Sequence, residues 1–318
     1  MGIKHLLSIE QLRPDDLEYL VNRSLNLASG DAGRDRTLDG RAVGLYFTGT
    51  STRTRTAFTM AAFRCGAATI SYGPRDLQIA TGETIADTAR VLSGYLDALI
   101  IRTNDSIEEM WAFAQQDEMA IINAMSENEH PTQAIADLST VKEIFGRLDG
   151  IHVLYLGEGN NTAASLALAV SLTPGMQLTL VTPVGYGLPD SLLQTAQDLA
   201  HQHGAQIEHH HDVKRLPVEV DAVYTARWQT MGVPKLEPNW QIKFQPYSVT
   251  PSLMAQVSKP STIFLHDLPA VRGADVLDEV IDGPQSRAFR QSRHKLFSAM
   301  AILEWCIAGA VRDPRSRF

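Results

Sequence analysis

Short apolar runs alternate with longer segments of helical hydrophobic spacing along most of the chain. In the first part, four runs rich in Val, Ile, Leu and Ala are short enough for buried strands, at 41–48, 68–73, 97–103 and 119–124. A second series begins after a helix-like segment, with runs at 151–159, 176–183, 221–227 and 261–267. Strands that alternate with helices favour parallel sheets. The pattern therefore predicts an α/β fold with two parallel β-sheets, each flanked by helices.

The length of 318 residues also suits two domains. We expect the boundary within 131–150, where no Gly/Ser linker interrupts the helical pattern. Residues 1–132 would form the first domain and 133–294 the second. The stretch "SRHKLFSAMAILEWCIAGAV" near the end has apolar residues at helical spacing. It could pack on either domain, and we expect residues 295–318 to pack back on the first.

Composition excludes several classes of protein. The net charge is −8, from 28 basic and 36 acidic residues, so a broad basic surface for nucleic acid is not expected. No apolar run approaches the ~20 residues of a membrane span, and the first residues lack the pattern of a secretory signal. We therefore expect a cytoplasmic protein that binds no membrane. Cys65 and Cys306 both lie in apolar settings, which predicts core residues and no disulfide.

The stretch "TGTSTRTRTAF" at 48–58 concentrates hydroxyls and guanidinium groups after an apolar run. Its pattern predicts a strand, a tight turn and a helix that begins near residues 51–54. Free amide groups and the positive end of the helix dipole favour a phosphate there, and an arginine adds a charged clamp. Arg53 and Arg55 lie about 200° apart on a helix, so we assign Arg53 to the ligand and Arg55 to structure. Taken alone, the stretch fits a capped helix with solvated arginines equally well.

Five further motifs follow in order: "GETIADTARVL" (82–92), "IIRTN" (100–104), "HPTQAIADL" (130–138), "LGEGNNTAASLAL" (156–168) and "HDLPAVRGADV" (266–276). Together with "STRTR" they resemble the aspartate and ornithine carbamoyltransferase family over nearly the whole chain. Six ordered motifs are far more specific than any single glycine pattern.

This resemblance implies that the first domain binds carbamoyl phosphate. The residues that match the family's carbamoyl phosphate site are Ser51, Thr52, Arg53, Thr54, Arg102, His130, Gln133 and Lys295, where the ornithine type has an arginine in place of the lysine. Arg102, His130 and Thr54 are the catalytic candidates, because donors that converge on the carbonyl oxygen stabilise the oxyanion of the transition state. The acceptor's own amine attacks, so neither a nucleophilic side chain, a cofactor nor a metal is required. Outside this motif, His130 would more simply be a capping or core histidine.

The resemblance places the amine acceptor on the second domain, where the sequence departs from both family types. Asn161 matches the ornithine type, whereas the aspartate type has an arginine there. In "VYTARWQTMG" (223–232), Ala226 replaces the aspartate with which ornithine enzymes hold the substrate's α-ammonium group. Arg227 and Gln229 match the carboxylate-binding pair of the aspartate type, while Met231 keeps the ornithine-type ending.

The motif "HDLP" carries Asp267 where ornithine enzymes have cysteine and aspartate enzymes have proline, and Leu268 follows it. A buried carboxylate needs compensation. Asp267 would therefore pair either with a cationic acceptor group or internally with Arg272. Gln78 matches an ornithine-type glutamine, in a loop that reaches a neighbouring subunit in this family. A homotrimer with shared active sites is thus implied by the resemblance.

These matches predict an acceptor with a carboxylate and a second cationic nitrogen, such as a diamino or guanidino acid. Ornithine remains open, and aspartate fits less well because Asp267 would repel its second carboxylate. Two rival functions also remain open. One is a dinucleotide-dependent dehydrogenase, although Gly157 and Gly159 are followed by Thr162 instead of the third glycine of the fingerprint. The other is a non-catalytic paralogue that binds carbamoyl phosphate or an amino acid.

The run "EHHHD" at 208–212 could suggest a zinc site. Successive residues of a strand point to opposite faces, so these histidines cannot converge on one ion. We expect a solvated edge there and no metal.

Overall fold

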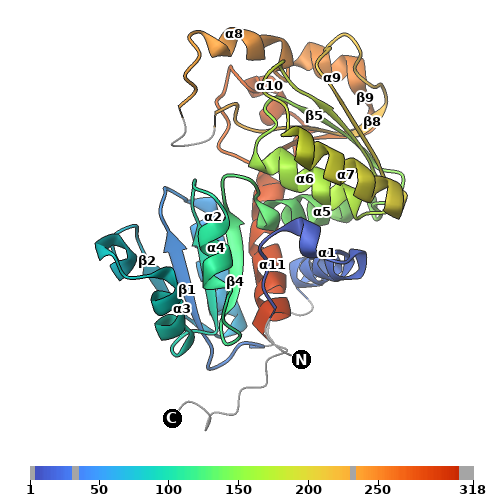
Figure 1. The fold of residues 1–318 in the computed structure, drawn as a ribbon. Helices are drawn as coiled ribbons and strands as arrows, with labels where there is room; N and C mark the ends of the chain where they lie inside the picture. Colours follow the sequence, from blue (N-terminus) through green and yellow to red (C-terminus); the bar gives the residue numbers. More distant parts are fainter. Residues whose placement is uncertain (1–3, 31–35, 230–233, 308–318) are drawn as a thin grey trace. The chain divides into compact units, whose positions relative to one another are not determined.

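The computed structural model describes residues 4–30, 36–229 and 234–307, and Figure 1 shows its two sheets. The chain divides into two compact units. The first unit runs to Ser139 and resumes at His294, and the second comprises Thr140–Arg293. The division lies inside the range 131–150 in which we expected the boundary, a few residues after position 132.

The first unit is built on a four-stranded parallel sheet in the order β2-β1-β3-β4. Its strands are β1 (Ala42–Phe47), β2 (Ala68–Tyr72), β3 (Ala98–Arg102) and β4 (Ala120–Met125). Every residue of β3 and β4 is buried, as their continuous apolar sequences predict. The helices of this part of the chain are α1 (Pro14–Ser29), α2 (Arg53–Cys65), α3 (Ile85–Ser93), α4 (Glu108–Phe113), α5 (Pro131–Phe145) and α11 (Ala288–Ile307), with short 3-10 helices at Ile9–Gln11 and Gln78–Thr81.

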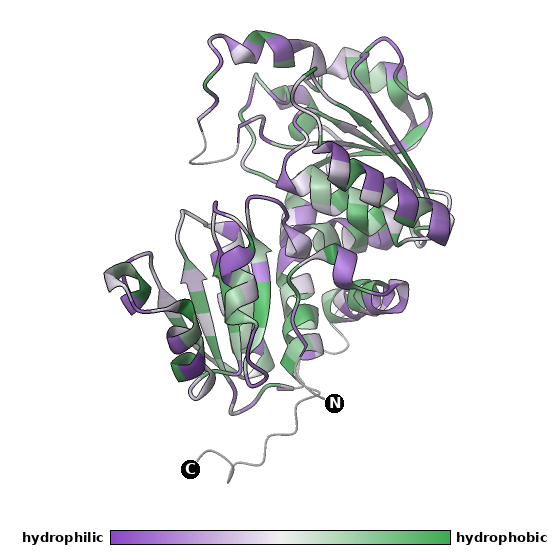
Figure 2. Cartoon of the chain, in the orientation of Figure 1, coloured by the Kyte–Doolittle hydropathy of each residue, from purple (hydrophilic) through white to green (hydrophobic). Residues whose placement is uncertain are grey.

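The second unit contains a five-stranded parallel sheet in the order β7-β6-β5-β8-β9. Its strands are β5 (His152–Leu156), β6 (Gln177–Val181), β7 (Gln206–His210), β8 (Val220–Thr225) and β9 (Ser258–His266). Its helices are α6 (Asn161–Ser171), α7 (Asp190–His203), α8 (Trp240–Phe244), α9 (Pro251–Val257) and α10 (Asp278–Ile281), with a 3-10 helix at Gln245–Tyr247. In Figure 2 the strands are largely green, whereas α7 carries purple bands of polar residues.

The predicted fold class is confirmed, and all eight predicted strands are present. The ninth strand, β7, was not among the predicted apolar runs, because only Ile207 of its five residues is fully buried. As the last strand of the sheet it needs one apolar position and tolerates polar residues elsewhere. Cys65 and Cys306 are buried free thiols. Among the described helices, none combines the length and hydrophobicity that crossing a bilayer requires.

Candidate active site

Except for Lys295 in α11, the residues predicted to bind carbamoyl phosphate lie at the end of a strand of the first sheet or in the segment that follows one. Phe47 at the end of β1 is aligned with Arg102 at the end of β3, and Arg102 is aligned with Met125 at the end of β4. Helix α2 follows β1, and α5 follows β4. The carboxyl ends of adjacent parallel strands meet at one edge, which is where α/β proteins place their ligands.

The start of α2 keeps its first amide groups free of side-chain capping. Thr52 is the N-cap residue, but its own backbone is helical and its hydroxyl makes no capping hydrogen bond. The capped-helix interpretation is therefore wrong for this stretch. Thr54 is buried and Ser51 is half-buried. The guanidinium carbon of Arg55 lies 5.0 Å from the centre of the Phe47 ring, a cation–π contact that accords with a structural role for Arg55.

Four predicted residues, of which Arg53 is half-buried and the others are buried, share one electrostatic environment. His130 is 5% exposed. Burial, and then the positive charges of Lys295, Arg102 and Arg53, hold the pKa of His130 well below its ordinary value. The imidazole is therefore neutral at pH 7, and three cations lie close enough to act on it. The hydroxyl of Thr132 lies 3.3 Å from His130 Nδ1, and a hydroxyl that donates to Nδ1 leaves the ring proton on Nε2.

Gln133 links α5 to α11. The Lys295 ammonium donates to Gln133 Oε1, and Gln133 Nε2 donates to Asp137 Oδ1 at 2.7 Å. All three side chains are buried. The sequence interpretation did not select Asp137 as a site residue, although it stands in the motif "HPTQAIADL". Its carboxylate orients the amide that in turn holds the buried lysine.

Gln78 does not join this group. It is exposed in the 3-10 helix Gln78–Thr81, and its side-chain carbonyl accepts a hydrogen bond from the Thr81 hydroxyl at 2.6 Å. Its role at a neighbouring subunit stays a prediction.

The acceptor residues of the second unit also lie along one sheet edge. Leu156 at the end of β5 is aligned with Thr225 at the end of β8, and Thr225 is aligned with His266 at the end of β9. Asn161 follows β5 as the first residue of α6 and is buried. Asn160 caps this helix by accepting from the backbone amides of residues 162 and 163, both at 3.1 Å. Arg227 and Asp267 follow β8 and β9 and thus belong to the same edge.

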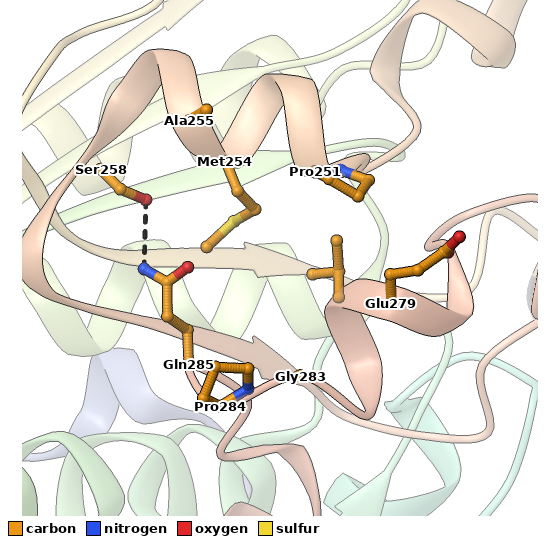
Figure 3. Close-up of a pocket in the computed structure, with 9 residues that line it drawn as sticks. Pro251, Met254, Ala255, Ser258, Glu279, Gly283, Pro284 and Gln285 are labelled. Atoms are coloured by element: carbon orange, nitrogen blue, oxygen red, sulfur yellow. Dashed lines mark hydrogen bonds between the residues drawn. The ribbon is translucent and has the colours of Figure 1, made fainter.

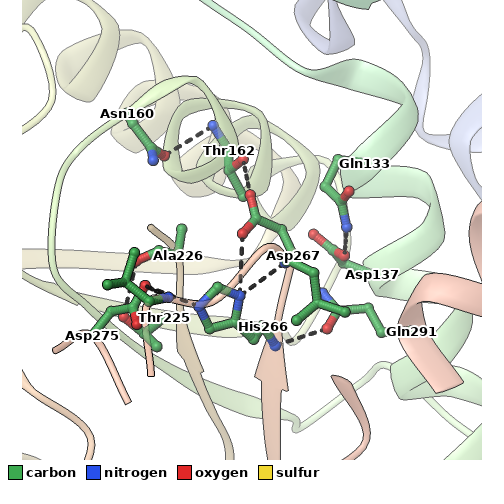
Figure 4. A network of polar contacts seen from close by, with 12 residues as sticks. Gln133, Asp137, Asn160, Thr162, Thr225, Ala226, His266, Asp267, Asp275 and Gln291 are labelled. Carbon is green, nitrogen blue, oxygen red and sulfur yellow. Dashed lines mark hydrogen bonds and ion pairs between the residues drawn. The ribbon is translucent and has the colours of Figure 1, made fainter. Parts of the chain in front are cut away.

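Asp267 belongs to a network of polar contacts around His266 (Figure 4). The Thr162 hydroxyl donates to Asp267 Oδ2 at 2.8 Å. The Leu268 amide donates to His266 Nδ1 at 2.8 Å, while His266 Nε2 lies 3.4 Å from Asp275 Oδ2. A ring that accepts at Nδ1 donates from Nε2, here toward Asp275.

The second oxygen of Asp267 consequently has no donor. His266 Nδ1 lies 3.5 Å from Asp267 Oδ1, which would be an ion pair only for a protonated ring. Since Nδ1 already accepts the Leu268 amide, it supplies no proton, and Oδ1 is buried without a hydrogen-bond partner among the described residues. Arg272 is bound elsewhere, to Asp278 at 2.7 Å and to Asp282 at 2.6 Å. The internal pair of Asp267 with Arg272 is therefore wrong.

Arg227 and Gln229 line a cavity of about 210 Å³ in the second unit, together with Trp228, Trp240, Gln241, Val271, Ala274 and Asp275. Met231 and Gly232 lie outside the described residues. Leu268 adopts a left-handed backbone with φ of 55°, an uncommon conformation for leucine, and its side chain packs against the core. A second cavity, of about 200 Å³, is shown in Figure 3 beside α9 and contains no predicted site residue.

Glu158 was not predicted as a site residue, although it stands in the motif "LGEGNNTAASLAL". Its carboxylate contacts the ammonium group of Lys235. That ammonium lies 4.7 Å from the ring centre of Tyr186, 5.4 Å from Trp240 and 5.3 Å from Phe244. Burial raises the pKa of the Glu158 carboxyl. The contact joins the loop after β5 to the chain that leads into α8.

The histidine run forms the outer strand β7 and the turn after it. His209 Nε2 lies 2.8 Å from the Thr182 hydroxyl, and His211 Nδ1 lies 2.8 Å from the carbonyl oxygen of the same residue. Burial lowers the pKa of His209. No group of three His, Cys, Asp or Glu side chains suited to a metal ion occurs in the part of the chain that is described.

Comparison with known proteins places both units in one family. Residues 4–143 match the family described as "Aspartate/ornithine carbamoyltransferase, carbamoyl-P binding domain", and residues 149–306 match "Aspartate/ornithine carbamoyltransferase, Asp/Orn binding domain". The ornithine carbamoyltransferase of Oceanobacillus iheyensis is 38% identical over 304 residues, which cover 94% of this chain and 93% of that protein. That of Caldicellulosiruptor saccharolyticus is also 38% identical, over 97% of this chain and 100% of that protein.

Solved structures agree with the sequence relatives. The structure of ornithine carbamoyltransferase from Pyrococcus furiosus has a TM-score of 0.90 and 32% identity, and the match covers 97% of this chain and 98% of that one. The structure of the anabolic ornithine carbamoyltransferase from Campylobacter jejuni has a TM-score of 0.88 and 28% identity, over 98% of this chain and 100% of that one. The chain therefore belongs to the aspartate/ornithine carbamoyltransferase family.

Proposed function

We propose that this carbamoyltransferase transfers the carbamoyl group of carbamoyl phosphate to an amino group of an ornithine-like acceptor, releasing a ureido product and phosphate. The observation that carries the proposal is the group formed by the buried Arg102 and Lys295 and the half-buried Arg53 around a neutral His130. Two guanidinium groups and an ammonium group that act on one site suit an anionic ligand, to which each can donate charge-assisted hydrogen bonds. A phosphate at the start of α2 is such a ligand.

The same residues support a mechanism by positioning and electrostatics. The acceptor amine attacks the carbonyl carbon, its new C–N bond forms, and the bond from that carbon to the phosphate oxygen breaks. The amine's proton leaves with the phosphate. Arg102, Thr54 and His130 donate hydrogen bonds to the carbonyl oxygen as it becomes an oxyanion. A neutral His130 donates without having to give up a full proton. Ser51, Thr52 and Arg53 bind the phosphate, and Gln133 binds the carbamoyl group.

The acceptor, in this proposal, has a carboxylate that Arg227 and Gln229 bind and a cationic nitrogen that Asp267 binds. The register of β8 and β9 supports this, because it aligns Thr225 with His266. The next residues, Ala226 and Asp267, therefore belong to neighbouring strand ends. The end of β8 thus lacks a carboxylate, and the end of β9 has one, of which one buried oxygen has no hydrogen-bond partner among the described residues. A diamino or guanidino acid fits such a hybrid site, whereas aspartate would bring a second carboxylate to Asp267.

Family resemblance supports two further elements of the proposal. The chain would assemble as a homotrimer in which the Gln78 loop reaches a neighbouring site, and the enzyme would be cytoplasmic. Light scattering of the purified protein measures its mass in solution. A monomeric mass would contradict the shared site.

The function is tested by incubating the protein with carbamoyl phosphate and a panel of diamino and guanidino acids. Mass spectrometry detects the ureido product, and phosphate release gives the rate. Product with at least one cationic acceptor, and none with Arg53→Ala, is the expected result. Absence of product with every acceptor, while carbamoyl phosphate still raises the melting temperature, would favour a non-catalytic paralogue.

A further inference from the structure

Lys235 is a largely buried lysine in the chain that leads into α8, and its side chain is 10% exposed. Its ammonium group contacts the carboxylate of Glu158, which is 17% exposed. The ring centres of Tyr186, Trp240 and Phe244 lie 4.7, 5.4 and 5.3 Å from the same ammonium group. The face of an aromatic ring attracts a cation, and more strongly where water is excluded. A carboxylate and an aromatic cage, formed by these three rings, therefore hold one cation.

The two charges of this pair depend on each other. Moving an ammonium group or a carboxylate out of water is unfavourable unless an opposite charge compensates it. Burial raises the pKa of Glu158, and the charge of Lys235 opposes that shift. Removing one partner would leave the other charge buried and uncompensated, which destabilises a protein more than replacing both partners. The second unit is thus most stable when the two segments that carry these residues stay in contact.

The Glu158 side of the pair belongs to the loop between β5 and α6. The amide of the next residue, Gly159, donates to the carbonyl oxygen of Tyr186 at 2.8 Å, so the backbone also ties this loop to the aromatic cage. Asn160 caps α6, and Asn161, the predicted acceptor residue, is the first residue of that helix. A displacement of this loop would therefore also move Asn161.

The aromatic cage connects Lys235 to the segment that follows β8. Trp228 lies between Arg227 and Gln229, the predicted carboxylate-binding pair. The ring centre of Trp228 is 5.4 Å from that of Phe244. Phe244 in turn packs against the other two rings of the cage, at 4.8 and 5.3 Å between ring centres. Packed rings thus link the lysine to the residues on either side of Trp228.

We propose that Lys235 and Glu158 are positioning residues for the acceptor. Their ion pair holds the loop before α6 against the segment between β8 and α8, so that Asn161 keeps a fixed spacing from Arg227 and Gln229. The effect on catalysis rests on the proposed function, whereas the contact between the two segments can be measured without a substrate. Because carbamoyl phosphate is assigned to residues of the first unit, its binding does not depend on this pair.

The kinetic test uses L-ornithine, L-lysine and L-arginine as acceptors, and the one with the highest kcat/KM serves for the variants. Lys235→Met removes the charge and keeps a long side chain. If the correct spacing is then present in about a tenth of the molecules, the acceptor KM rises about tenfold. The kcat should stay within about twofold of wild type, because the pair acts on binding and not on the reacting atoms. The KM for carbamoyl phosphate should not change.

Two further variants separate positioning from a general structural role. Lys235→Arg keeps a cation for Glu158 and the aromatic cage, and should restore the acceptor KM to within about threefold of wild type. Lys243→Met is the matched control. Lys243 lies 5.8 Å from the same Tyr186 ring, but it is 49% exposed and pairs with Glu237 at 2.6 Å. It should leave the KM of both substrates unchanged.

A double-mutant cycle and hydrogen exchange test the contact itself. Glu158→Gln and Lys235→Met should each raise the acceptor KM, and the double variant should be no worse than either, because no charge is left uncompensated. Hydrogen exchange followed by mass spectrometry needs no substrate. Amides of residues 159–164 should exchange about tenfold faster in Lys235→Met and as in wild type in Lys243→Met.

Unchanged exchange at the start of α6 in both single variants would overturn the proposal. Additive effects in the double variant, or an equal rise in KM for acceptor and carbamoyl phosphate, would do the same. Glu158→Gln carries the comparison if Lys235→Met does not fold. A wild-type protein that forms no product with any acceptor would refute the proposed function. Faster exchange at the start of α6 in Lys235→Met would still support the contact between the two segments.

Discussion

Replacing Asp267 by asparagine should lower activity and raise stability, two effects of opposite sign. The Thr162 hydroxyl, 2.8 Å from Oδ2, can still donate to the asparagine carbonyl. The substitution removes the negative charge of a carboxylate whose other oxygen, Oδ1, is buried without a partner in the described part of the chain. A charge-assisted hydrogen bond to a cationic acceptor contributes about 1.5–3 kcal/mol, so kcat/KM should fall by about 10- to 150-fold.

The ligand-free protein should respond in the other direction. A carboxylate that is 16% exposed and has one unsatisfied oxygen destabilises the fold, and a neutral amide of the same shape removes the charge. We expect the free energy of unfolding to rise by about 1 kcal/mol. Steady-state kinetics with the preferred cationic acceptor and urea unfolding of the free protein measure the two effects.

Asp278→Asn is the control for these measurements. Asp278 also interacts with a neighbouring side chain of the second unit, but it is 66% exposed and pairs with Arg272. It should leave kcat/KM unchanged and alter stability by less than about 1 kcal/mol. An Asp267→Asn enzyme with wild-type kcat/KM for a cationic acceptor would refute the assignment of Asp267 to the acceptor.

Three other predictions concern the carbamoyl phosphate side and the fold. Arg53→Ala should abolish the thermal stabilisation by carbamoyl phosphate yet retain the wild-type circular dichroism spectrum; retained activity would refute the site. The pKa of His130 lies below that of an unfolded histidine, so the unfolded state binds more protons and stability should fall below about pH 6.5, by at most about 1.4 kcal/mol per pH unit. Urea unfolding from pH 5 to 8 should show a shallower slope for His130→Gln, and identical slopes would contradict the depressed pKa. Gly159→Ala should destabilise by about 3 kcal/mol or more, because its Cβ would lie 2.3 Å from the Leu188 backbone nitrogen. A melting temperature equal to wild type would show that this loop can shift.

The parallel strands and the phosphate-binding helix could be predicted because their signals are local. A buried strand of a parallel sheet needs a short, continuous apolar run, and β3 and β4 have one. Strand β7 has a single fully buried residue, and its polar sequence is explained only by its place at the edge of the sheet.

The sequence by itself determined the strand–turn–helix at residues 48–58 and, through ordered motifs, the family and the donor substrate. Residues that bind one phosphate can be consecutive, since a helix start presents them together. The tertiary structure decided which carboxylate oxygens of Asp267 and Asp275 make hydrogen bonds. Their availability depends on Thr162 and on which nitrogen of His266 carries the proton. Such contacts join residues up to 105 positions apart in the sequence. Whether a hydrogen bond forms depends on a few tenths of an ångström in the distance between its two atoms. A local sequence pattern encodes neither the contact nor this distance.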